Sequence, residues 1–299
     1  MTTVGVVIRT LDESELIGRC CDTLRDQHGD FDLDILVVDS GSTDDTVAIA
    51  RSRGARIVEL APGDFDYSKA LNLGIEQVRG EVAISISAHA IPVDDRWLER
   101  MVAPFDDPDV AGVSCRQVPW PDAPWQEIMR LRHFGSAKRV YSGGEGDEIV
   151  FSNAASAIRR SVWQEHPFTL PAVEDLDWAR RMVAAGLSIV YEPEAAVYHS
   201  HYESPRAQAR RMIDINRFQD VDRRRTRSRT LREAAKLLVH DGANILRLDE
   251  PARRKVAYLA DLVRMVWYYV VDFSRSGTTA EFRRADAGAS LGRTGPSDA

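Results

Sequence analysis

Two stretches of the sequence end an apolar run in a cluster of carboxylates and hydroxyls. The run 33–38 leads into Asp39 and a Ser-Gly-Ser-Thr turn, and the run 4–9 leads into a Thr-Leu-Asp-Glu segment. A buried parallel strand presents polar groups at its carboxyl end, where open α/β sheets bind ligands. Acceptor oxygens there suit the hydroxyls and base N–H groups of a nucleotide, and they repel bare phosphate unless a cation intervenes. We expect this ligand to be bound by Thr10, Asp12, Glu13, Asp39, Ser40 and Asp44.

Part of this cluster has a simpler interpretation as the start of a helix. Thr43 would be the N-cap, with Asp44 and Asp45 in the first turn, where carboxylates are favoured. We adopt this interpretation for Thr43 and Asp45. Asp39 precedes the turn and caps nothing, so it stays a ligand candidate.

The two stretches resemble the nucleotide-binding half of family 2 glycosyltransferases, which have the GT-A fold. In that family, strands ending near Thr-Leu-Asn-Glu and in Val-Asp-Ser-Gly-Ser-Thr-Asp hold the nucleotide of a sugar donor. Arg9 stands here where the family often has Pro, and Asp12 where it often has Asn. The resemblance covers about residues 4–201 and is strongest to the rhamnosyltransferase-like branch of polysaccharide and glycolipid biosynthesis. It implies a donor that is a UDP-, dTDP- or GDP-linked sugar.

The resemblance also implies a metal site. At the end of the fourth strand, GT-A enzymes carry an Asp-any-Asp motif whose second carboxylate binds a divalent cation. Ser87-Ala88-His89 stands at that place, so His89 would be the ligand, and Ser87 and Ala88 would adjoin the donor. In the family, a histidine late in the domain also binds the metal, and His199 matches it. His201 lies two residues further on, just past the expected strand 195–199, so it would point the same way as His199.

Mn²⁺ or Mg²⁺ is the expected cofactor, with imidazole favouring Mn²⁺ or another transition metal. Alternatively, these histidines hydrogen-bond the diphosphate or have a structural role only. Lys69 is the best protein cation for the same phosphates, and its simpler interpretation is a solvated helix lysine.

An adjacent Glu-Asp pair, Glu174 and Asp175, begins an amphipathic helix predicted over 174–185. The residues alone allow a plain helix N-terminus, at which each acid contributes only about 0.3–1 kcal/mol. In the family an Asp at this place deprotonates the acceptor hydroxyl, so the resemblance implies that Asp175 is the catalytic base of an inverting displacement. Glu174, Trp178 and Asn153, the last in a run of small residues, would contact the acceptor.

Strands alternating with helices predict an α/β fold with a mostly parallel central sheet. The expected strands are 4–9, 33–38, 55–60, 81–87, 110–115, 188–191 and 195–199, and the expected helices are about 13–27, 43–53, 66–79, 124–139, 174–185, 205–225, 229–246 and 251–273. We therefore expect a GT-A domain with a nucleotide-sugar half (1–115) and an acceptor half (116–204), a C-terminal helical appendage (205–275) and a disordered tail (276–299).

Composition indicates a globular protein, with 44% hydrophobic and 28% charged residues among 299. Three cysteines, two of them adjacent, fit neither a disulfide framework nor a zinc site. Together with the absence of an apolar leader, this predicts a cytoplasmic location.

The net charge of −7 conceals a split. Arg206–Arg232 carries ten arginines against three aspartates, so this block is at +7 and the remainder at −14.

The apolar, aromatic run 256–273 is interrupted by Asp261 and Arg264, and its apolar runs are far shorter than the roughly 20 residues of a membrane span. It is expected to pack on the catalytic domain or to form a homodimer interface. The alternative is a peripheral contact with the inner face of a membrane.

Two other classes of protein fit the sequence less well. A nucleotidyltransferase needs a Gly-rich phosphate loop, which does not follow Arg9. A non-catalytic protein could bind a sugar nucleotide, or nucleic acid through Arg206–Arg232, but no nucleic-acid motif and no interleaved aromatic residues accompany that block. The sequence therefore predicts a metal-dependent, inverting glycosyltransferase that acts on a saccharide, lipid-linked or small-molecule hydroxyl.

Overall fold

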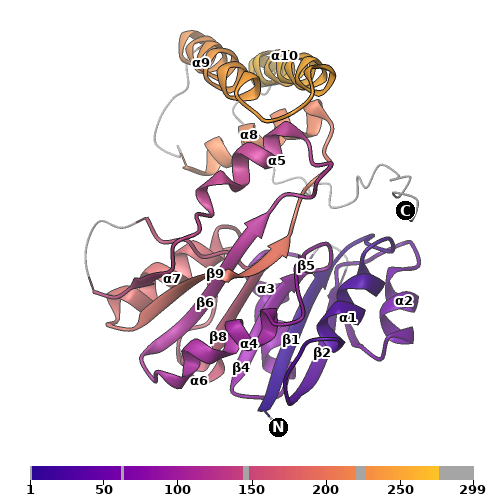
Figure 1. Ribbon diagram of the computed structural model, residues 1–299, viewed down its shortest axis with the longest axis vertical. Coiled ribbons are helices and arrows are strands. Elements are labelled where there is room, and N and C mark those ends of the chain that lie inside the picture. Colours follow the sequence, from indigo (N-terminus) through magenta and orange to yellow (C-terminus); the bar gives the residue numbers. More distant parts are fainter. Residues whose placement is uncertain (1, 62–63, 144–147, 220–226, 276–299) are drawn as a thin grey trace. The chain divides into compact units, whose positions relative to one another are not determined.

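The computed structural model describes residues 2–61, 64–143, 148–219 and 227–275 (Figure 1). The chain divides into two compact units, one comprising Met1–Asp122 with Glu127–Ser200 and the other Ala123–Gln126 with His201–Ala299. The division after Ser200 falls close to the predicted start of the helical appendage. The predicted disordered tail 276–299 lies outside the described residues.

A mixed nine-stranded sheet is the framework of the first unit, with strand order β3-β2-β1-β4-β8-β6-β9-β5 and β7 paired with β9. Strands β3, β2, β1 and β4 run parallel to one another, whereas β8 pairs antiparallel with β4. The strands are β1 (Thr2–Thr10), β2 (Phe31–Asp39), β3 (Arg56–Glu59), β4 (Val82–Ser87), β5 (Ile91–Pro92), β6 (Val110–Val118), β7 (Arg139–Tyr141), β8 (Ala155–Arg159) and β9 (Ser188–Tyr198).

The register of the parallel strands brings the predicted site residues to one edge of the sheet. Thr10 at the end of β1 lies opposite Asp39 at the end of β2, and Arg9 lies opposite Ser87 at the end of β4. The chain leaves β1 on one side to form β2 and β3 and returns on the other side as β4. Such a point of reversal is where open α/β sheets bind ligands.

Helices cover both faces of this sheet (Figure 1). Val6 and Ile8 of β1 pack with residues of α1, α2 and α4, whereas Val7 packs with residues of α3, α6 and α7. Gly74 lets α3 approach β1 closely, because a Cβ at that position would lie 2.3 Å from Cγ1 of Val7. The helices that cover the sheet are α1 (Ile17–Arg25), α2 (Thr46–Ser52), α3 (Tyr67–Gln77), α4 (Trp97–Val102), α6 (Arg160–Glu165) and α7 (Glu174–Ala184). Helix α5 (Trp125–Arg130) begins with two residues that belong to the second unit.

The structure corrects several predictions between residues 116 and 204. The helix expected over 124–139 ends at Arg130 and is followed by a 3₁₀ turn and then by β7. The two strands expected at 188–191 and 195–199 are one strand, β9, in which a bulge shifts the pairing with β6 from Glu192 to Ala196. Strand β8 and helix α6 were not predicted, because Ala155–Arg159 is built from small residues that lack a strand pattern.

Three helices make up most of the second unit: α8 (Pro205–Gln219), α9 (Arg227–Leu246) and α10 (Ala252–Arg275). Both α8 and α9 pack on α10, and the hydroxyl of Tyr269 on α10 donates to Oε2 of Glu233 on α9 at 2.8 Å. Among the described helices, none combines the length and the apolar character needed to cross a membrane. Most side chains of the Arg206–Arg232 block lie outside the described residues.

Candidate functional site

The loops after β1 and β2 are tied together by hydrogen bonds between side chains and backbone. The backbone N–H of Thr43 donates to Oδ1 of Asp12 at 2.7 Å, and that of Asp12 donates to Oγ of Ser42 at 2.9 Å. The backbone N–H of Ser14 donates to Oδ2 of Asp44 at 3.1 Å. Asp12 has φ 51°, a left-handed conformation that is uncommon outside glycine. These polar residues therefore fix the two loops against each other.

Asp44 anchors the start of α2, which corrects the expected cap. Asp45 directly precedes the helix and makes no side-chain cap bond, and the Thr43 hydroxyl donates to Asp12 instead. Oδ1 of Asp44 accepts the backbone N–H of Thr46 at 3.0 Å. Burial raises the pKa of Asp44, but the hydrogen bonds from Thr46 and Ser14 outweigh it and lower the pKa to about 2.

Asp39 shapes its own turn. Its side chain is 2% exposed, Oδ2 accepts the backbone N–H groups of Gly41 and Ser42 at 3.0 Å, and Oδ1 accepts the Ser42 hydroxyl at 2.5 Å. A carboxylate has about four acceptor positions. Asp39 can therefore accept about one more hydrogen bond. Ser40 is held beside it, because its N–H donates to the Thr10 carbonyl at 3.0 Å.

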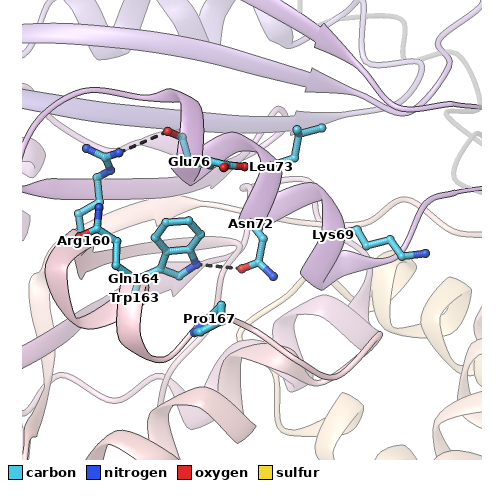
Figure 2. Close-up of a pocket in the computed structure, with 8 residues that line it drawn as sticks. All are labelled: Lys69, Asn72, Leu73, Glu76, Arg160, Trp163, Gln164 and Pro167. Carbon is cyan, nitrogen blue, oxygen red and sulfur yellow. Dashed lines mark hydrogen bonds between the residues drawn. The ribbon is translucent and has the colours of Figure 1, made fainter.

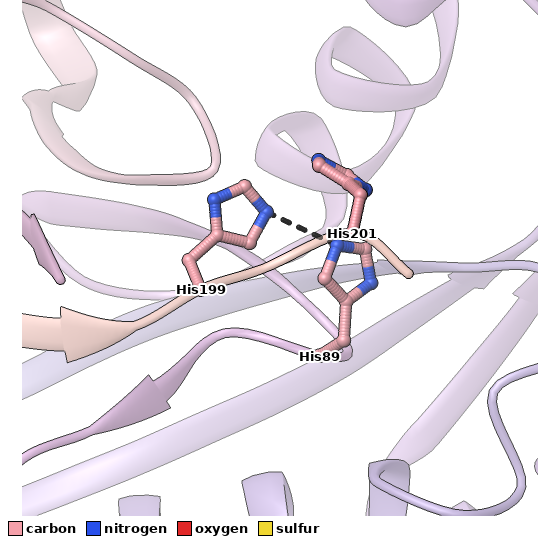
Figure 3. Close-up of side chains that lie close together, drawn as sticks. All are labelled: His89, His199 and His201. Atoms are coloured by element: carbon pink, nitrogen blue, oxygen red, sulfur yellow. Dashed lines mark hydrogen bonds between the residues drawn. The ribbon is translucent and has the colours of Figure 1, made fainter. Parts of the chain in front are cut away.

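Three histidines gather at the same edge of the sheet (Figure 3). One ring nitrogen from each of His89, His199 and His201 lies within 4.8 Å of those of the other two. Strand β9 ends at Tyr198, so His199 and His201 follow the strand rather than alternate along it. His201 is the first residue of the second unit and is joined to His199 through Ser200.

The two histidines of the first unit are oriented through their Nδ1 atoms. Nδ1 of His89 lies 2.7 Å from Oε1 of Glu13, and Nδ1 of His199 lies 2.7 Å from Oε1 of Gln117. Both partners are acceptors, so each Nδ1 carries a hydrogen. Glu13 thus orients His89, and its contact with the donor stays a prediction.

The Nε2 atoms of the same two rings face each other at 3.1 Å. With hydrogens on both Nδ1 atoms, neutral rings would direct two lone pairs at each other, which is stable only when a proton or a metal cation lies between them. Imidazole ligands with a carboxylate or carbonyl behind them are typical of metal sites. This donor set fits a transition-metal ion better than Mg²⁺, which prefers oxygen.

The carboxylates at the start of α7 converge on Asn153. The backbone N–H of Asn153 donates to Oδ2 of Asp175 at 3.3 Å, and its side-chain amide donates to Oε1 of Glu174 at 3.3 Å. Oδ1 of Asp175 accepts the backbone N–H of Leu176 at 2.8 Å. Val173, just before the pair, has φ 59°, a strained value for a β-branched residue and one that is concentrated at functional sites.

Burial raises the pKa of both carboxyl groups. For Glu174 the negative charge of Asp175 raises it further, and for Asp175 hydrogen bonds from Leu176 and Asn153 lower it in part. The positive charge of Arg9 opposes the rise at both groups. A pKa raised toward neutrality suits a general base.

Arg9 is a site residue to which the sequence assigned no role. Its Nη2 donates to the carbonyl of Asn153 at 3.2 Å, and its guanidinium lies 5.1 Å from the centroid of the Tyr67 ring. An arginine at a strand end, among predicted ligand residues, was the available signal. The sequence could not show that the Arg9 side chain points toward α7, because this depends on how the strands pair in the folded chain.

Three predicted contact residues lie in the interior and do not fit a direct ligand contact. Trp178 has no exposed surface, and its indole N–H donates to the carbonyl of His166 at 2.7 Å. Asn153 is 1% exposed, and each of its polar atoms has a protein partner. Ala88 is 1% exposed, and its N–H donates to the carbonyl of Arg9 at 3.2 Å. These residues hold the site together.

A groove of about 580 Å³ lies on another part of the first unit, between α3 and α6 (Figure 2). The indole N–H of Trp163 donates to Oδ1 of Asn72 at 2.8 Å inside it. Lys69 lies at its rim, 3.4 Å from Asp66, and no other predicted site residue lines it. The role of Lys69 toward the donor phosphates stays a prediction. The groove is lined by Lys69, Asn72, Leu73, Glu76, Arg160, Trp163, Gln164 and Pro167.

Comparison with known proteins identifies the family. The family described as "Glycosyl transferase family 2" matches residues 5–166, which is more than half of the chain. The chain belongs to glycosyl transferase family 2. The match covers the strands β1, β2 and β4 and the loops that carry Asp12, Asp39 and His89.

Curated relatives of this family 2 member include two O-antigen chain rhamnosyltransferases. RfbN of Salmonella typhimurium is 31% identical over 226 residues, which are 72% of each chain. WbaN of Salmonella anatum is 32% identical over 194 residues, which are 62% of each chain. These matches agree with the branch of the family that the sequence resembled, and the chain is a glycosyltransferase.

Solved structures show the same fold. The mannosyltransferase PcManGT from Pyrobaculum calidifontis, in complex with GDP-Man and Mn²⁺, is similar with a TM-score of 0.52 and 18% identity, covering 92% of this chain and 76% of that one. Glucosyl-3-phosphoglycerate synthase from Mycobacterium tuberculosis is similar with a TM-score of 0.51 and 21% identity, covering 73% and 79%. The family 2 chain has the GT-A fold, as predicted.

Replacing Asp44 by Asn should lower the free energy of unfolding by about 0.3–1 kcal/mol at neutral pH, because Asn can still accept the cap hydrogen bond but lacks the negative charge that is favoured at the start of a helix. The folded pKa of about 2 lies below the ordinary value of 3.8, so the carboxylate stabilises the protein above that value. The difference from the wild type should shrink as the pH falls toward 2. Urea unfolding between pH 7 and pH 3 measures it, with Asp45→Asn as the control. An equal loss at every pH, or an equal loss in the control, would contradict the assignment.

Proposed function

We propose that this glycosyltransferase transfers a deoxyhexose, rhamnose in the first instance, from a nucleotide-diphosphate sugar to a hydroxyl of a saccharide acceptor. The transfer would be metal-assisted and would invert the anomeric centre. Two curated relatives named O-antigen chain rhamnosyltransferases support rhamnose and a polysaccharide acceptor. The observation that carries the reaction is the buried carboxylate pair at the start of α7.

The loops after β1 and β2 are the proposed nucleotide site. Asp12 and Ser40 are partly exposed there, and Asp39 keeps about one acceptor position. Acceptor oxygens of this kind suit the imide N–H of thymine or uracil and the hydroxyls of the sugar. Their fixed positions mean that little order is lost on binding.

Asp175 is the proposed base. Its carboxylate takes the proton of the acceptor hydroxyl as that oxygen forms a bond to the anomeric carbon. The bond from this carbon to the diphosphate oxygen breaks in the same step, and the nucleoside diphosphate leaves with the electron pair. Because the nucleophile attacks opposite the leaving group, the anomeric configuration inverts.

His89, His199 and His201 are the proposed metal ligands, with Glu13 and Gln117 orienting the first two. A divalent cation bound there would act as a Lewis acid toward the charge on the departing diphosphate. A structurally similar mannosyltransferase was solved with Mn²⁺ and GDP-Man. This supports Mn²⁺ as the first ion to test.

A donor screen tests the transfer reaction. Purified protein with Mn²⁺ is given UDP-, dTDP- and GDP-linked sugars, and release of free nucleoside diphosphate is followed. We expect hydrolysis of one donor, dTDP-linked rhamnose first. Asp175→Asn should lower that rate about 10²–10⁴-fold, the range of general base catalysis, while calorimetry shows donor affinity within a few-fold of the wild type.

Asp177→Asn is the matched control for this variant, because Asp177 lies in the same helical turn and pairs with Arg181 at 3.0 Å. It should keep the wild-type rate. A rate close to the wild type for Asp175→Asn would remove Asp175 as the base. Failure of every donor to bind would remove the donor site.

Metal binding has a readout independent of turnover. The protein should reduce the EPR signal of free Mn²⁺ with about one site per chain, and Mg²⁺ at the same concentration should compete poorly because imidazole is a weak ligand for it. His89→Ala should weaken Mn²⁺ binding about 10–100-fold or more, as loss of a ligand or its partner does. His133→Ala, at an exposed histidine, should not change it. Unaltered Mn²⁺ binding in His89→Ala would reject the site.

The second unit is the proposed contact with a membrane surface. Val256, Ala260, Val263 and Trp267 share one face of α10, and Val256, Val263 and Trp267 are 66%, 58% and 58% exposed. Residues 205–275 carry 17 lysines and arginines against nine acids, a net charge of +8, whereas the rest of the chain is at −15. An apolar stripe on a basic unit suits an anionic lipid surface. A homodimer through this face would bring two units of +8 together.

Co-sedimentation with vesicles tests this contact. We expect binding to phosphatidylcholine vesicles containing one-quarter phosphatidylglycerol at low salt, and loss of binding in pure phosphatidylcholine or at 0.5 M salt, where screening is nearly complete beyond about 4 Å. Val263→Ser/Trp267→Ser should bind severalfold more weakly. Val140→Ser is the control, because Val140 on β7 is exposed to the same 58%. No binding at low salt, or dimerisation that the double variant abolishes, would reject a lipid surface.

A further inference from the structure

Arg9 links the nucleotide half of the site to the carboxylates of α7. From β1 its Nη2 reaches the carbonyl of Asn153 at 3.2 Å, and the N–H groups of Asn153 donate to Asp175 and Glu174. The guanidinium lies 5.1 Å from the ring centroid of Tyr67. Its Nε is buried and makes no hydrogen bond within the described part of the chain. The site thus holds an arginine whose guanidinium is not fully satisfied by protein groups.

The negative charges of Glu174 and Asp175 are only partly compensated by the positive charges around them. Glu174 and Asp175 are adjacent and largely buried, so each disfavours ionisation of the other. Arg9 is the cation whose charge acts on both. On α7, Asp177 pairs with Arg181 at 3.0 Å, and on α3, beside Tyr67, Asp66 pairs with Lys69 at 3.4 Å.

We propose that Arg9 is a positioning residue for the acceptor-side base: its guanidinium supplies the counter-charge that keeps Asp175 ionised in a buried site and holds it in place through Asn153. This inference rests on the proposed function, since only an ionised carboxylate takes a proton from the acceptor. An arginine suits this place better than a lysine, because a planar guanidinium stacks on an aromatic ring and bonds a carbonyl at once.

Removing the charge should make the base titrate at higher pH. In Arg9→Met the carboxyl groups should stay protonated over a wider range, and the base is inactive in that form. With dTDP-linked rhamnose as donor and water as acceptor, the acid limb of kcat/KM should move up by about one pH unit or more, the effect of one nearby opposite charge. The rate should therefore fall about tenfold on the acid limb and far less on the plateau above it.

Glu174→Gln should rescue this defect. The second substitution removes the neighbouring negative charge, so in Arg9→Met/Glu174→Gln the acid limb should return toward that of the wild type. An arginine that only packs, or that binds the donor diphosphate, would give a uniform loss at all pH values that Glu174→Gln does not restore. Arg159→Met is the control: Arg159 also ends a strand and stacks on a ring, 5.4 Å from Phe105, but it bonds the carbonyls of Val110, Phe105 and Asp107.

Thermal unfolding gives the same test without any turnover. A carboxyl group whose folded pKa is raised favours the folded state below its ordinary pKa and ceases to do so as the pH rises through the folded pKa. The melting temperature of Arg9→Met should therefore fall further below that of the wild type between pH 4.5 and pH 8, and the double variant should lose most of this trend. Arg159→Met should show a difference that does not depend on pH.

The outcomes separate the two proposals. A normal rate in Asp175→Asn rejects the base, and with it the proposed mechanism. An inactive Asp175→Asn together with an unmoved acid limb in Arg9→Met, or a pH-independent melting difference, rejects the role of Arg9 alone. If no donor is hydrolysed, the melting series with and without Glu174→Gln still decides whether Arg9 compensates the pair.

Discussion

The buried amide of Asn153 joins the parts of the site that come from different elements. Its carbonyl accepts from Arg9 on β1 and from Ser85 on β4, its side chain accepts from Ser156 on β8, and its N–H groups donate to the carboxylates that begin α7. A buried polar group left without partners is destabilising by about 1–3 kcal/mol, so these bonds act as one set. The position of Asp175 is thereby tied to the strand ends that carry the donor loops.

Two residues beside the predicted site carboxylates have strained backbone conformations. Asp12 and Val173 are the non-glycine residues with positive φ in the described parts of the chain, and each adjoins a predicted site carboxylate. Asp12 turns its carboxylate toward the loop after β2, and Val173 brings Glu174 and Asp175 to the first turn of α7. Such conformations persist only where surrounding contacts over-determine them. Here the contacts are the bonds between the two loops and those to Asn153.

The sequence predicts the position of this edge of the sheet well, because strand ends are local patterns. Apolar runs ending at Thr10, Asp39 and Ser87 placed these residues together, and the parallel pairing of β1 with β2 and β4 does so. Roles that depend on burial could not be predicted. Trp178 and Asn153 have residue types common at sugar sites, but their direction is set by packing between α7, β8 and the loops before them. The sequence likewise could not predict that β9 continues as one strand past its bulge, because this depends on its pairing with β6.

The donor half and the acceptor half of the proposed site differ in the charge that has to be compensated, so different counter-ions suit them. The chain outside residues 205–275 is at −15, and the donor that it is proposed to bind carries a diphosphate. Near the end of β4, the Nε2 atoms of two histidines face each other at 3.1 Å. This arrangement favours a cation between them, which could offset the charge of the diphosphate. In the proposed mechanism the start of α7 instead keeps a negative charge in a buried place. There a fixed guanidinium, which is always charged, is the suitable partner. In the proposed mechanism a mobile cation at Asp175 would neutralise the group that accepts a proton. Arg9 would instead supply positive charge nearby, while its hydrogen bond to Asn153 leaves the carboxylate able to accept.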